Sequence, residues 1–252
     1  MSVASKPEPA SRLLAAFDFD LTIVSVVVDF EIIKLLPPHI KVPRGKKSIV
    51  EFMSEVFEVL HEQNIPPELI RNTIQSIPPV EGQLALIKHL KQTHGMDIII
   101  VSDSNSFFID EWLKLHQMHE FILKVFSNPA VFKPNGCLQI KPYDDQIECL
   151  LSSKNMCKGN VLMDFVAERR RQNIVYEAIL FIADGPNDIC PALRLKQQDI
   201  VAARKGFQLE GLLCQHANKF KAELILWNNG IDLREQLESK LAAYSTVCDP
   251  AI

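Results

Sequence analysis

The chain has 252 residues, of which 47% are hydrophobic and 23% charged, a balance that suits one globular domain with or without an insert and excludes disorder as the default. The net charge of −4 leaves no broad basic field for nucleic acid or an anionic membrane. The N-terminus lacks a basic segment followed by an apolar one, and the apolar stretch Leu21 to Val28 is far too short to span a bilayer, so we expect a cytoplasmic protein that binds neither nucleic acid nor membrane.

The first part of the chain predicts a strand followed by a helical insert. Residues 1–11 carry Ser, Pro, Lys and Glu and are typical of a loose tail. The apolar run Leu13 to Phe17 stops at a carboxylate, Asp18, as strands buried on both faces of a parallel sheet do. From about Asp29 to Gln75 the spacing is helical, and proline pairs interrupt it. We therefore expect an insert over residues 29–78 that divides a core formed by residues 12–28 and 79–252.

Similar apolar runs recur further along the chain. Asp97 to Val101 precedes Ser102-Asp103, and Ala178 to Ala183 precedes Asp184. Two further candidate strands are Ile122–Phe126 and Asp199–Ala203, and a hairpin is expected over Val131–Ile140. The three candidate helices are Ser106–His116, Asn160–Gln172 and Asn187–Lys196. This alternation predicts an α/β fold, a Rossmann-like parallel sheet with helices on both faces. Ligands bind such sheets at the carboxyl ends of the strands.

The cysteines carry no metal-binding pattern in the sequence. The six of them stand at positions 137, 149, 157, 190, 214 and 248, without CxxC spacing, and the seven histidines do not cluster with them. We therefore expect reduced thiols, several of them in the core, and no structural zinc site.

Polar clusters stand where the predicted strands end. Asp18, Asp20 and Thr22 alternate along an extended segment, so their side chains can converge on one cation, although a turn with solvated carboxylates would look the same. The segment from Asp184 to Asp188 is either part of an oxygen-rich Mg²⁺ site or a helix cap. Ser102 to Asn105 offers a hydroxyl and backbone N–H groups to a phosphate, or simply caps the next helix. Lys158, taken alone, indicates only a surface charge.

In this order the four segments resemble the haloacid-dehalogenase superfamily of phosphatases. The match consists of DxDxT at Asp18 to Thr22, a strand ending in Ser102-Asp103, a helix-opening Lys158 and a DGxND turn at Asp184 to Asp188, and it covers residues 13 to about 207. The chain is similar in particular to the phosphoethanolamine/phosphocholine phosphatase family, which also contains members assigned to pyridoxal phosphate. The segments that carry this resemblance are Phe17–Ile23, Ser102–Ile109, Ser127–Pro129, Asn155–Lys158, Asp188–Pro191 and Arg204–Phe207.

The resemblance implies a magnesium-dependent phosphatase whose helical insert is a cap that closes over the site. Asp18 would be the nucleophile that forms an aspartyl-phosphate, and Asp20 the general acid and then the general base. Mg²⁺ would be held by Asp18, by Asp184 and by the backbone carbonyl of Asp20. Lys158 and the Ser102 hydroxyl would neutralise and orient the transferred phosphoryl group.

The resemblance also implies supporting and substrate-binding residues. Thr22 and Asp188 would support the site, Asp188 by orienting Lys158 or a metal-bound water. Asp29 and Asp103 match positions that bind the substrate in the family. Two carboxylates there would suit an ammonium headgroup, although Asp29 is equally expected as a helix N-cap.

The chain departs from the family pattern where the rim of the site is expected. Ser25 to Val28 replaces an acidic, serine-containing stretch, and the cysteine-rich segment before the lysine motif is shortened to Glu148–Lys154. Both departures bear on the choice of substrate. The first expectation is phosphoethanolamine or phosphocholine, and the alternative is pyridoxal phosphate. A phosphotransferase on the same fold is a further alternative, and the sequence predicts no oligomeric state.

Overall fold

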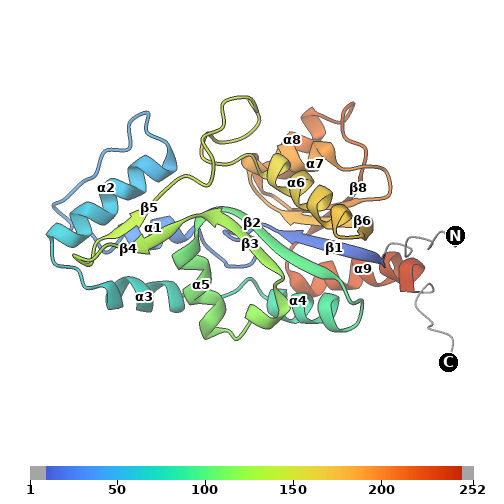
Figure 1. Cartoon of the computed structure of the whole chain (residues 1–252), viewed down its shortest axis with the longest axis horizontal. Helices are drawn as coiled ribbons and strands as arrows, with labels where there is room; N and C mark the ends of the chain where they lie inside the picture. The colour runs from blue at the N-terminus through green and yellow to red at the C-terminus, as the bar shows by residue number, and fades with distance from the viewer. Residues whose placement is uncertain (1–9, 246–252) are drawn as a thin grey trace, which may run out of the picture.

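The computed structural model describes residues 10–245. Six parallel strands form one sheet in the order β3-β2-β1-β6-β7-β8 (Figure 1). The strands are β1 (Ala10–Phe17), β2 (Asp97–Asn105), β3 (Lys124–Asn128), β6 (Ile174–Ala183), β7 (Ile200–Arg204) and β8 (Glu223–Trp227). The predicted α/β fold is confirmed. Of the predicted tail, residues 1–9 lie outside the described residues, and Ala10 and Ser11 belong to β1 because they pair with the start of β6.

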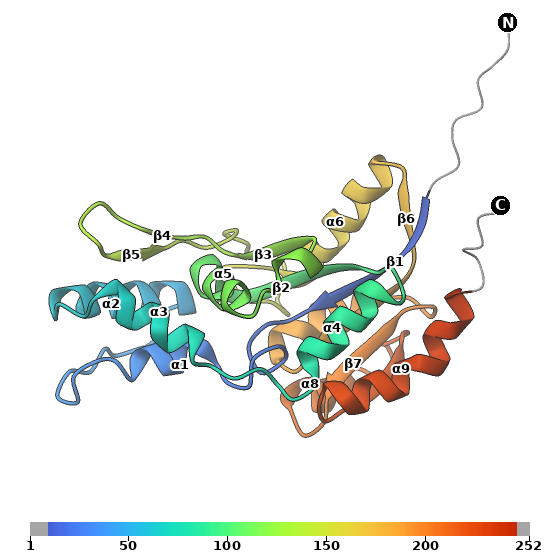
Figure 2. The same cartoon turned by 90° about the horizontal axis from the view of Figure 1, so that it is seen from below.

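Alternate residues of each strand face two helical layers that cover the sheet. In β1, Leu14 and Ala16 belong to one buried cluster, and Ala15 and Phe17 belong to the other. One layer contains α4 (Gln83–Gln92), α5 (Ser106–Leu115) and α9 (Gly230–Ser245), and the other contains α6 (Lys158–Arg171), α7 (Ile189–Arg194) and α8 (Gln208–Gln215) (Figures 1 and 2). Because both faces are buried, the strands are almost continuously apolar.

The segment after β1 forms three helices beyond the carboxyl ends of the strands (Figure 2). They are α1 (Val28–Ile33), α2 (Ile49–Glu62) and α3 (Pro67–Gln75). Ser48 and Glu51 begin α2 with a reciprocal cap: the Ser48 hydroxyl accepts from the Glu51 N–H at 3.2 Å, and the Glu51 carboxylate accepts from the Ser48 N–H at 2.7 Å. The hairpin of β4 (Ala130–Phe132) and β5 (Leu138–Ile140) extends beside α2, although it comes later in the chain than the predicted insert (Figure 1).

Two glycines join the turn before α4 to the start of α9. The Gly230 N–H donates to the carbonyl of Glu81 at 2.7 Å, and Gly82 has a φ of +73°, in the left-handed region. A Cβ added to Gly230 would lie 2.4 Å from the carbonyl carbon of Gly82, so a side chain cannot be accommodated there without moving the backbone. The two glycines thus allow α9 to pack closely against α4.

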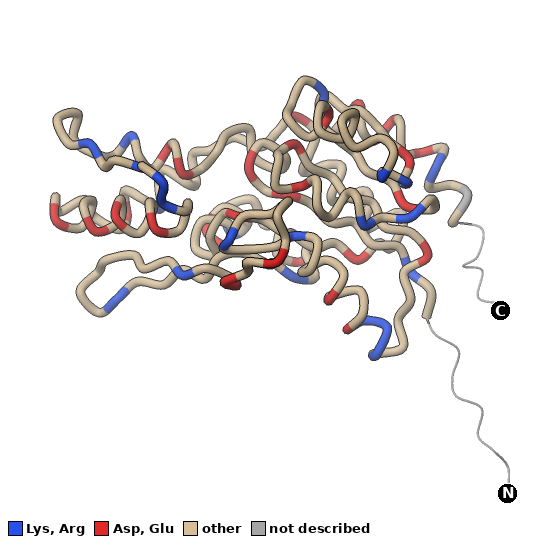
Figure 3. The backbone as a smooth tube through the Cα atoms, turned by 90° about the horizontal axis from the view of Figure 1, so that it is seen from above, with Lys and Arg blue, Asp and Glu red and all other residues tan. Residues whose placement is uncertain are grey.

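Charged residues of both signs are distributed along the chain (Figure 3). Acidic residues recur along α2, at Glu51, Glu55, Glu58 and Glu62, and basic residues occupy the segment before it, at Lys41, Arg44, Lys46 and Lys47. Within residues 10–245 no helix is both long enough and apolar enough to cross a membrane.

Candidate active site

The polar residues that end the predicted strands meet at one edge of the sheet. β1 lies between β2 and β6, and the Asp18 N–H donates to the carbonyl of Ile182 at 2.9 Å. Asp184 follows β6 directly, and Ser102 and Asp103 lie near the end of β2. These side chains could be placed together from the sequence alone, because neighbouring parallel strands present their carboxyl ends at the same edge.

Lys158 contacts two carboxylates at the floor of this site. It is the first residue of α6, and its side chain is fully buried. Its Nζ lies 2.8 Å from Oδ1 of Asp18 and 2.8 Å from Oδ1 of Asp188. Burial alone would lower the pKa of Lys158, but the carboxylates of Asp18 and Asp188 raise it. The lysine therefore carries a fixed positive charge inside the site instead of on the surface.

Three buried carboxylates converge beside this lysine. One oxygen atom from each of Asp18, Asp184 and Asp188 lies within 4.8 Å of the others. The Thr22 hydroxyl donates to Oδ1 of Asp184 at 3.0 Å. Burial and the neighbouring Asp18 raise the pKa of Asp184 to about 7, because ionising a buried carboxyl group beside another carboxylate is costly, and a cation bound there would lower that cost. Three buried oxygen donors fit a hard cation such as Mg²⁺, and Asp188 places a further carboxyl oxygen beside the predicted ligands Asp18 and Asp184.

The turn after Asp18 presents Asp20 to a cavity. Leu21 has a φ of +56°, in the left-handed region, within the turn between β1 and α1. Oδ1 of Asp20 accepts a hydrogen bond from the Val28 N–H at 3.2 Å, at the start of α1. Withdrawal from water, with the Asp29 and Asp18 carboxylates nearby, raises the pKa of Asp20 well above its usual range. The Asp20 carboxyl group therefore keeps its proton to a higher pH than an exposed aspartate does.

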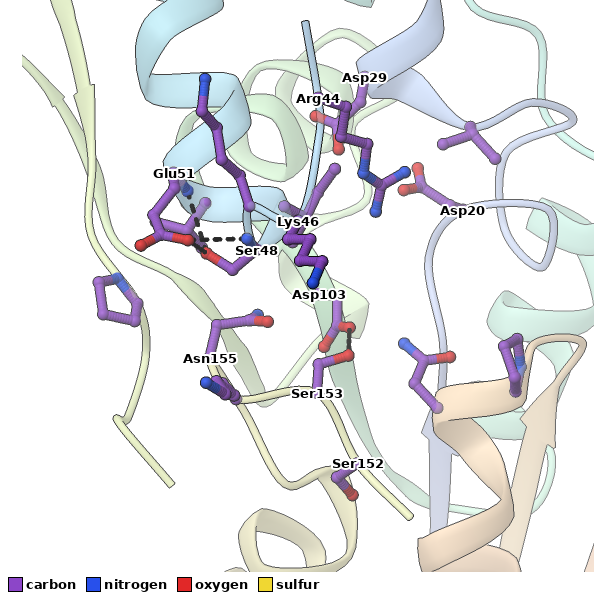
Figure 4. Close-up of a pocket in the computed structure, with 18 of the residues that line it drawn as sticks. Asp20, Asp29, Arg44, Lys46, Ser48, Glu51, Asp103, Ser152, Ser153 and Asn155 are labelled. Carbon is purple, nitrogen blue, oxygen red and sulfur yellow. Dashed lines mark hydrogen bonds between the residues drawn. The ribbon is translucent and has the colours of Figure 1, made fainter. Parts of the chain in front are cut away.

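The cavity has a volume of about 1110 Å³ and is lined by Asp20, Asp29 and Asp103, which come from the turn after β1, from α1 and from β2 (Figure 4). Asp29 is not an N-cap, because α1 begins at Val28 and Val27 occupies the cap position. Burial raises the pKa of Asp29 to about 7, although Arg44 opposes this shift. The structure thus brings both predicted substrate residues to one cavity with the predicted general acid.

Further residues of the cavity were not predicted. Arg44 and Lys46 project into it from the segment before α2, with the Arg44 guanidinium beside Asp20 and Asp29 (Figure 4). On another wall, the Ser153 hydroxyl donates to Oδ2 of Asp103 at 3.1 Å. In the sequence, a basic segment after a proline and a serine in a loop look like ordinary surface residues, and only the fold reveals where they point.

Ser102 and Arg204 lie at the same edge of the sheet. Ser102 is buried, and its hydroxyl accepts a hydrogen bond from the Ser104 N–H at 3.2 Å. Among the described contacts, it makes no direct hydrogen bond to Asp18 or Lys158. Arg204, the last residue of β7, donates to the carbonyl of Leu21 and so supports the turn that carries Asp20. A signal for Arg204 existed in the sequence, because it ends an apolar run as Asp18 and Asp184 do.

The sequence matches known phosphatases over most of its length. Residues 13–241 match the family described as "Putative Phosphatase". The "Pyridoxal phosphate phosphatase PHOSPHO2" of Bos taurus is 34% identical over 236 residues, which are 90% of this chain and 98% of that protein. The "Phosphoethanolamine/phosphocholine phosphatase" of Homo sapiens is 30% identical over 244 residues, which are 92% of this chain and 90% of that protein.

Solved structures share the fold. The structure named "Phospho-Aspartyl Intermediate Analogue of Phosphoserine phosphatase" aligns with a TM-score of 0.59 at 20% identity, over 91% of this chain and 99% of that one. A likeness at this identity establishes the architecture, a parallel sheet flanked by helices, and leaves the substrate to be argued from the site.

Proposed function

Because the chain belongs to the family described as "Putative Phosphatase", of the haloacid-dehalogenase type, and is thereby a phosphatase, we propose that it hydrolyses small phosphomonoesters through an aspartyl-phosphate on Asp18. One observation carries the proposal. The Asp18 carboxylate lies 2.8 Å from the buried ammonium of Lys158, beside a cavity lined by a carboxyl group of raised pKa, Asp20. A nucleophile, a cation for phosphoryl oxygens and a proton donor are thus available in one place.

The reaction would proceed in two displacements. First, a carboxylate oxygen of Asp18 bonds to phosphorus while the bond to the leaving oxygen breaks, and Asp20 gives its proton to that oxygen. Lys158 and the Ser102 hydroxyl would hold the phosphoryl oxygens during the transfer. Then Asp20 takes a proton from a water molecule whose oxygen attacks phosphorus. The bond from Asp18 to phosphorus breaks, inorganic phosphate leaves, and both side chains return to their starting states.

Asp18, Asp184, Asp188 and the backbone carbonyl of Asp20 would hold Mg²⁺. The ion would supply positive charge that offsets the repulsion between the Asp18 carboxylate and a doubly charged phosphate monoester. The oxygen-only donor set and the raised pKa of Asp184, about 7, support this assignment.

The cavity supports a substrate with an amine in its leaving group, and we propose phosphoethanolamine or phosphocholine. Asp29 and Asp103 place two carboxyl groups on the cavity wall, and an ammonium group removed from water requires such partners. The human relative named for these two substrates matches over 92% of this chain.

A second candidate, pyridoxal phosphate, is favoured by other residues of the same cavity. Val27 and Phe30 make part of its wall apolar, and Arg44 lies close enough to Asp29 to oppose the rise of its pKa. An apolar wall suits a flat ring, and a guanidinium beside Asp29 would compete with a substrate ammonium for that carboxylate. The bovine relative named for this substrate is 34% identical to the chain.

The test is a phosphate-release assay with Mg²⁺ on phosphoethanolamine, phosphocholine, pyridoxal phosphate and an aryl phosphate. If each carboxylate contributes about 1.5–3 kcal/mol to binding an ammonium, Asp29→Asn and Asp103→Asn should each raise KM for the amine substrates roughly tenfold to a hundredfold, with little change for the aryl phosphate. Asp145→Asn, at an exposed position of the same cavity, is the matched control.

Three outcomes would revise the proposal. Equal losses for all substrates would mean that Asp29 and Asp103 support the fold or the catalytic loop. A preference for pyridoxal phosphate that survives both substitutions would favour the second candidate. Release of the leaving alcohol that requires an added alcohol acceptor, with the phosphoryl group recovered on that acceptor instead of as inorganic phosphate, would identify a phosphotransferase.

A further inference from the structure

Three cysteines that are distant in the sequence meet in the fold. Sγ of Cys149 lies 3.4 Å from Sγ of Cys190, and Sγ of Cys157 lies 3.6 Å from Sγ of Cys190. All three sulfur atoms lie within 4.8 Å of one another. The sequence predicted no such site, because these thiols come from a loop, from the cap of α6 and from α7, and therefore show no motif spacing.

A fourth donor atom completes the cluster. The hydroxyl of Ser152 lies 3.4 Å from the sulfur of Cys149 and 3.4 Å from the sulfur of Cys157. Around a tetrahedral zinc ion, with Zn–S near 2.3 Å and Zn–O near 2.0 Å, sulfur atoms lie about 3.8 Å apart and a sulfur and an oxygen about 3.5 Å apart. The four separations given above, 3.4–3.6 Å, are close to the corresponding edges of that tetrahedron.

Polar groups surround the three sulfur atoms, and a bound cation would have to displace the proton of Cys190, because burial and the neighbouring Cys149 thiol raise the pKa of Cys190 to about 12. Cys157 and Cys190 are buried, and the sulfur of Cys157 accepts from the N–H of Asn160 at 3.4 Å and from the guanidinium of Arg194 at 3.8 Å. Burial would raise the pKa of the Cys149 thiol, but hydrogen bonds with Ser152 and Cys190 lower it to about 7. A purely apolar core cluster would contain neither a hydroxyl nor an arginine.

We propose that Cys149, Cys157 and Cys190 bind one thiophilic divalent cation, Zn²⁺ in the first place, with the Ser152 hydroxyl at the fourth corner. This site is chemically distinct from the carboxylate site, since thiolates select soft cations and the aspartates select hard ones. A closed set of four ligands is the arrangement of a structural metal, with no open position for a reacting water.

The bound ion would fasten one wall of the substrate cavity. The loop from Cys149 to Cys157 supplies Leu150 to Asn155 to that wall, including Ser153, which bonds to Asp103. The residue after Cys157 is Lys158, and Cys190 follows Asp188 by two positions. The ion would therefore fix the loop to the start of α6, where Lys158 lies, and to the start of α7, directly after Asp188.

Metal content of the full chain provides the test. The protein should be purified under reducing conditions, without an affinity tag that binds metals, and analysed by elemental mass spectrometry in Mg²⁺ buffer. We expect about one zinc ion per chain, released when a mercurial reagent blocks the thiols. Replacing zinc with Co²⁺ should produce thiolate-to-cobalt charge-transfer absorption and the visible bands of a tetrahedral site. None of these readouts depends on enzymatic activity.

Variants locate the ion. Cys149→Ser, Cys157→Ser and Cys190→Ser should each lose the zinc and the cobalt bands, whereas Cys214→Ser, at an exposed cysteine outside the cluster, should keep both. Ser152→Cys should retain the ion longer against a zinc-selective chelator, because it supplies a fourth thiolate. A gain of metal retention in this variant cannot result from misfolding, whereas a loss of metal in the cysteine variants could. The proposal is overturned if the folded, reduced wild-type chain takes up neither Zn²⁺ nor Co²⁺. It is also overturned if the cluster variants keep the metal, or if the chain isolated without oxidant contains a disulfide among these cysteines.

Discussion

Lys158 is buried beside three carboxyl groups, those of Asp18, Asp184 and Asp188. Its ammonium contacts Asp18 and Asp188, while Asp184 has the Thr22 hydroxyl as its hydrogen-bond donor and a pKa raised to about 7. A buried ion pair loses stability when one partner is removed, because the other charge is left unpaired. Here Lys158 would still contact Asp188 after the loss of Asp18, and Asp184 and Asp188 would lose a neighbouring carboxylate that opposes their ionisation.

Asp18→Asn should therefore abolish the phosphatase activity and leave the stability of the fold nearly unchanged. The change removes the proposed nucleophile and one proposed metal ligand, so phosphate release should fall by about 10⁴-fold or more. The thermal midpoint without Mg²⁺ should remain close to that of the wild-type chain. Phosphate-release kinetics and a thermal melt measure the two quantities, and Asp110→Asn, at an exposed position of α5, serves as the control. Near-normal turnover in Asp18→Asn would refute the covalent mechanism.

At the scale of elements, the contact between Gly82 and Gly230 joins α9 to the turn before α4. The backbones approach so closely that a Cβ on Gly230 would lie 2.4 Å from the carbonyl carbon of Gly82. Overcrowding of packed backbone costs typically about 1–3 kcal/mol. Gly211, inside α8, contrasts with this pair, because nothing lies within 4 Å of the position that its Cβ would take.

Gly230→Ala and Gly211→Ala should consequently change stability in opposite directions. Gly230→Ala should lower the free energy of unfolding by about 1–3 kcal/mol. Gly211→Ala should raise it by roughly 0.4–1 kcal/mol, since alanine is the better helix former and restricts the unfolded chain. Urea unfolding followed by circular dichroism measures both values. Two variants of equal stability would mean that the glycine contact does not constrain α9.

Elements with a strong local pattern could be predicted, and elements defined by their neighbours could not. The strands β1, β2 and β6 are apolar runs that end in polar site residues, so both the sheet and the edge that holds Asp18 and Asp184 follow from the sequence. In contrast, α4, α8, β8 and α9 were not predicted. β8 is only partly buried at the sheet edge, and α9 depends on the glycine contact with another segment. The thiol cluster escaped prediction for the same reason.

For the molecule as a whole, the proposed function requires that Mg²⁺ supports both turnover and stability. The oxygen donors of Asp18, Asp184 and Asp188 are buried together, so a cation that binds them stabilises the folded state over the unfolded one. At a Mg²⁺ concentration 100 times the dissociation constant, this linkage amounts to about 2.7 kcal/mol.

A chelator should abolish phosphate release, and added Mg²⁺ should restore it, while Zn²⁺ should replace Mg²⁺ poorly because the donors are all hard oxygens. Mg²⁺ should also raise the thermal midpoint of the wild-type chain. Asp184→Ala should raise the Mg²⁺ requirement or silence the enzyme, and its thermal midpoint should respond less to Mg²⁺. Full activity in excess chelator would exclude the metal-assisted mechanism.

The position of β1 at the centre of the sheet also affects how the chain folds during its synthesis. β1 is synthesised first, and it pairs with β2 on one side, but its other neighbour, β6, lies in the last third of the chain. At about 5–20 residues per second, a ribosome needs on the order of ten seconds to proceed from β1 to β6. During that time one edge of β1, an apolar strand, stays unpaired. Nascent chains that stop before residue 174 should therefore bind chaperones or aggregate, and cooperative closure of the sheet should follow only after β6 has emerged from the ribosome.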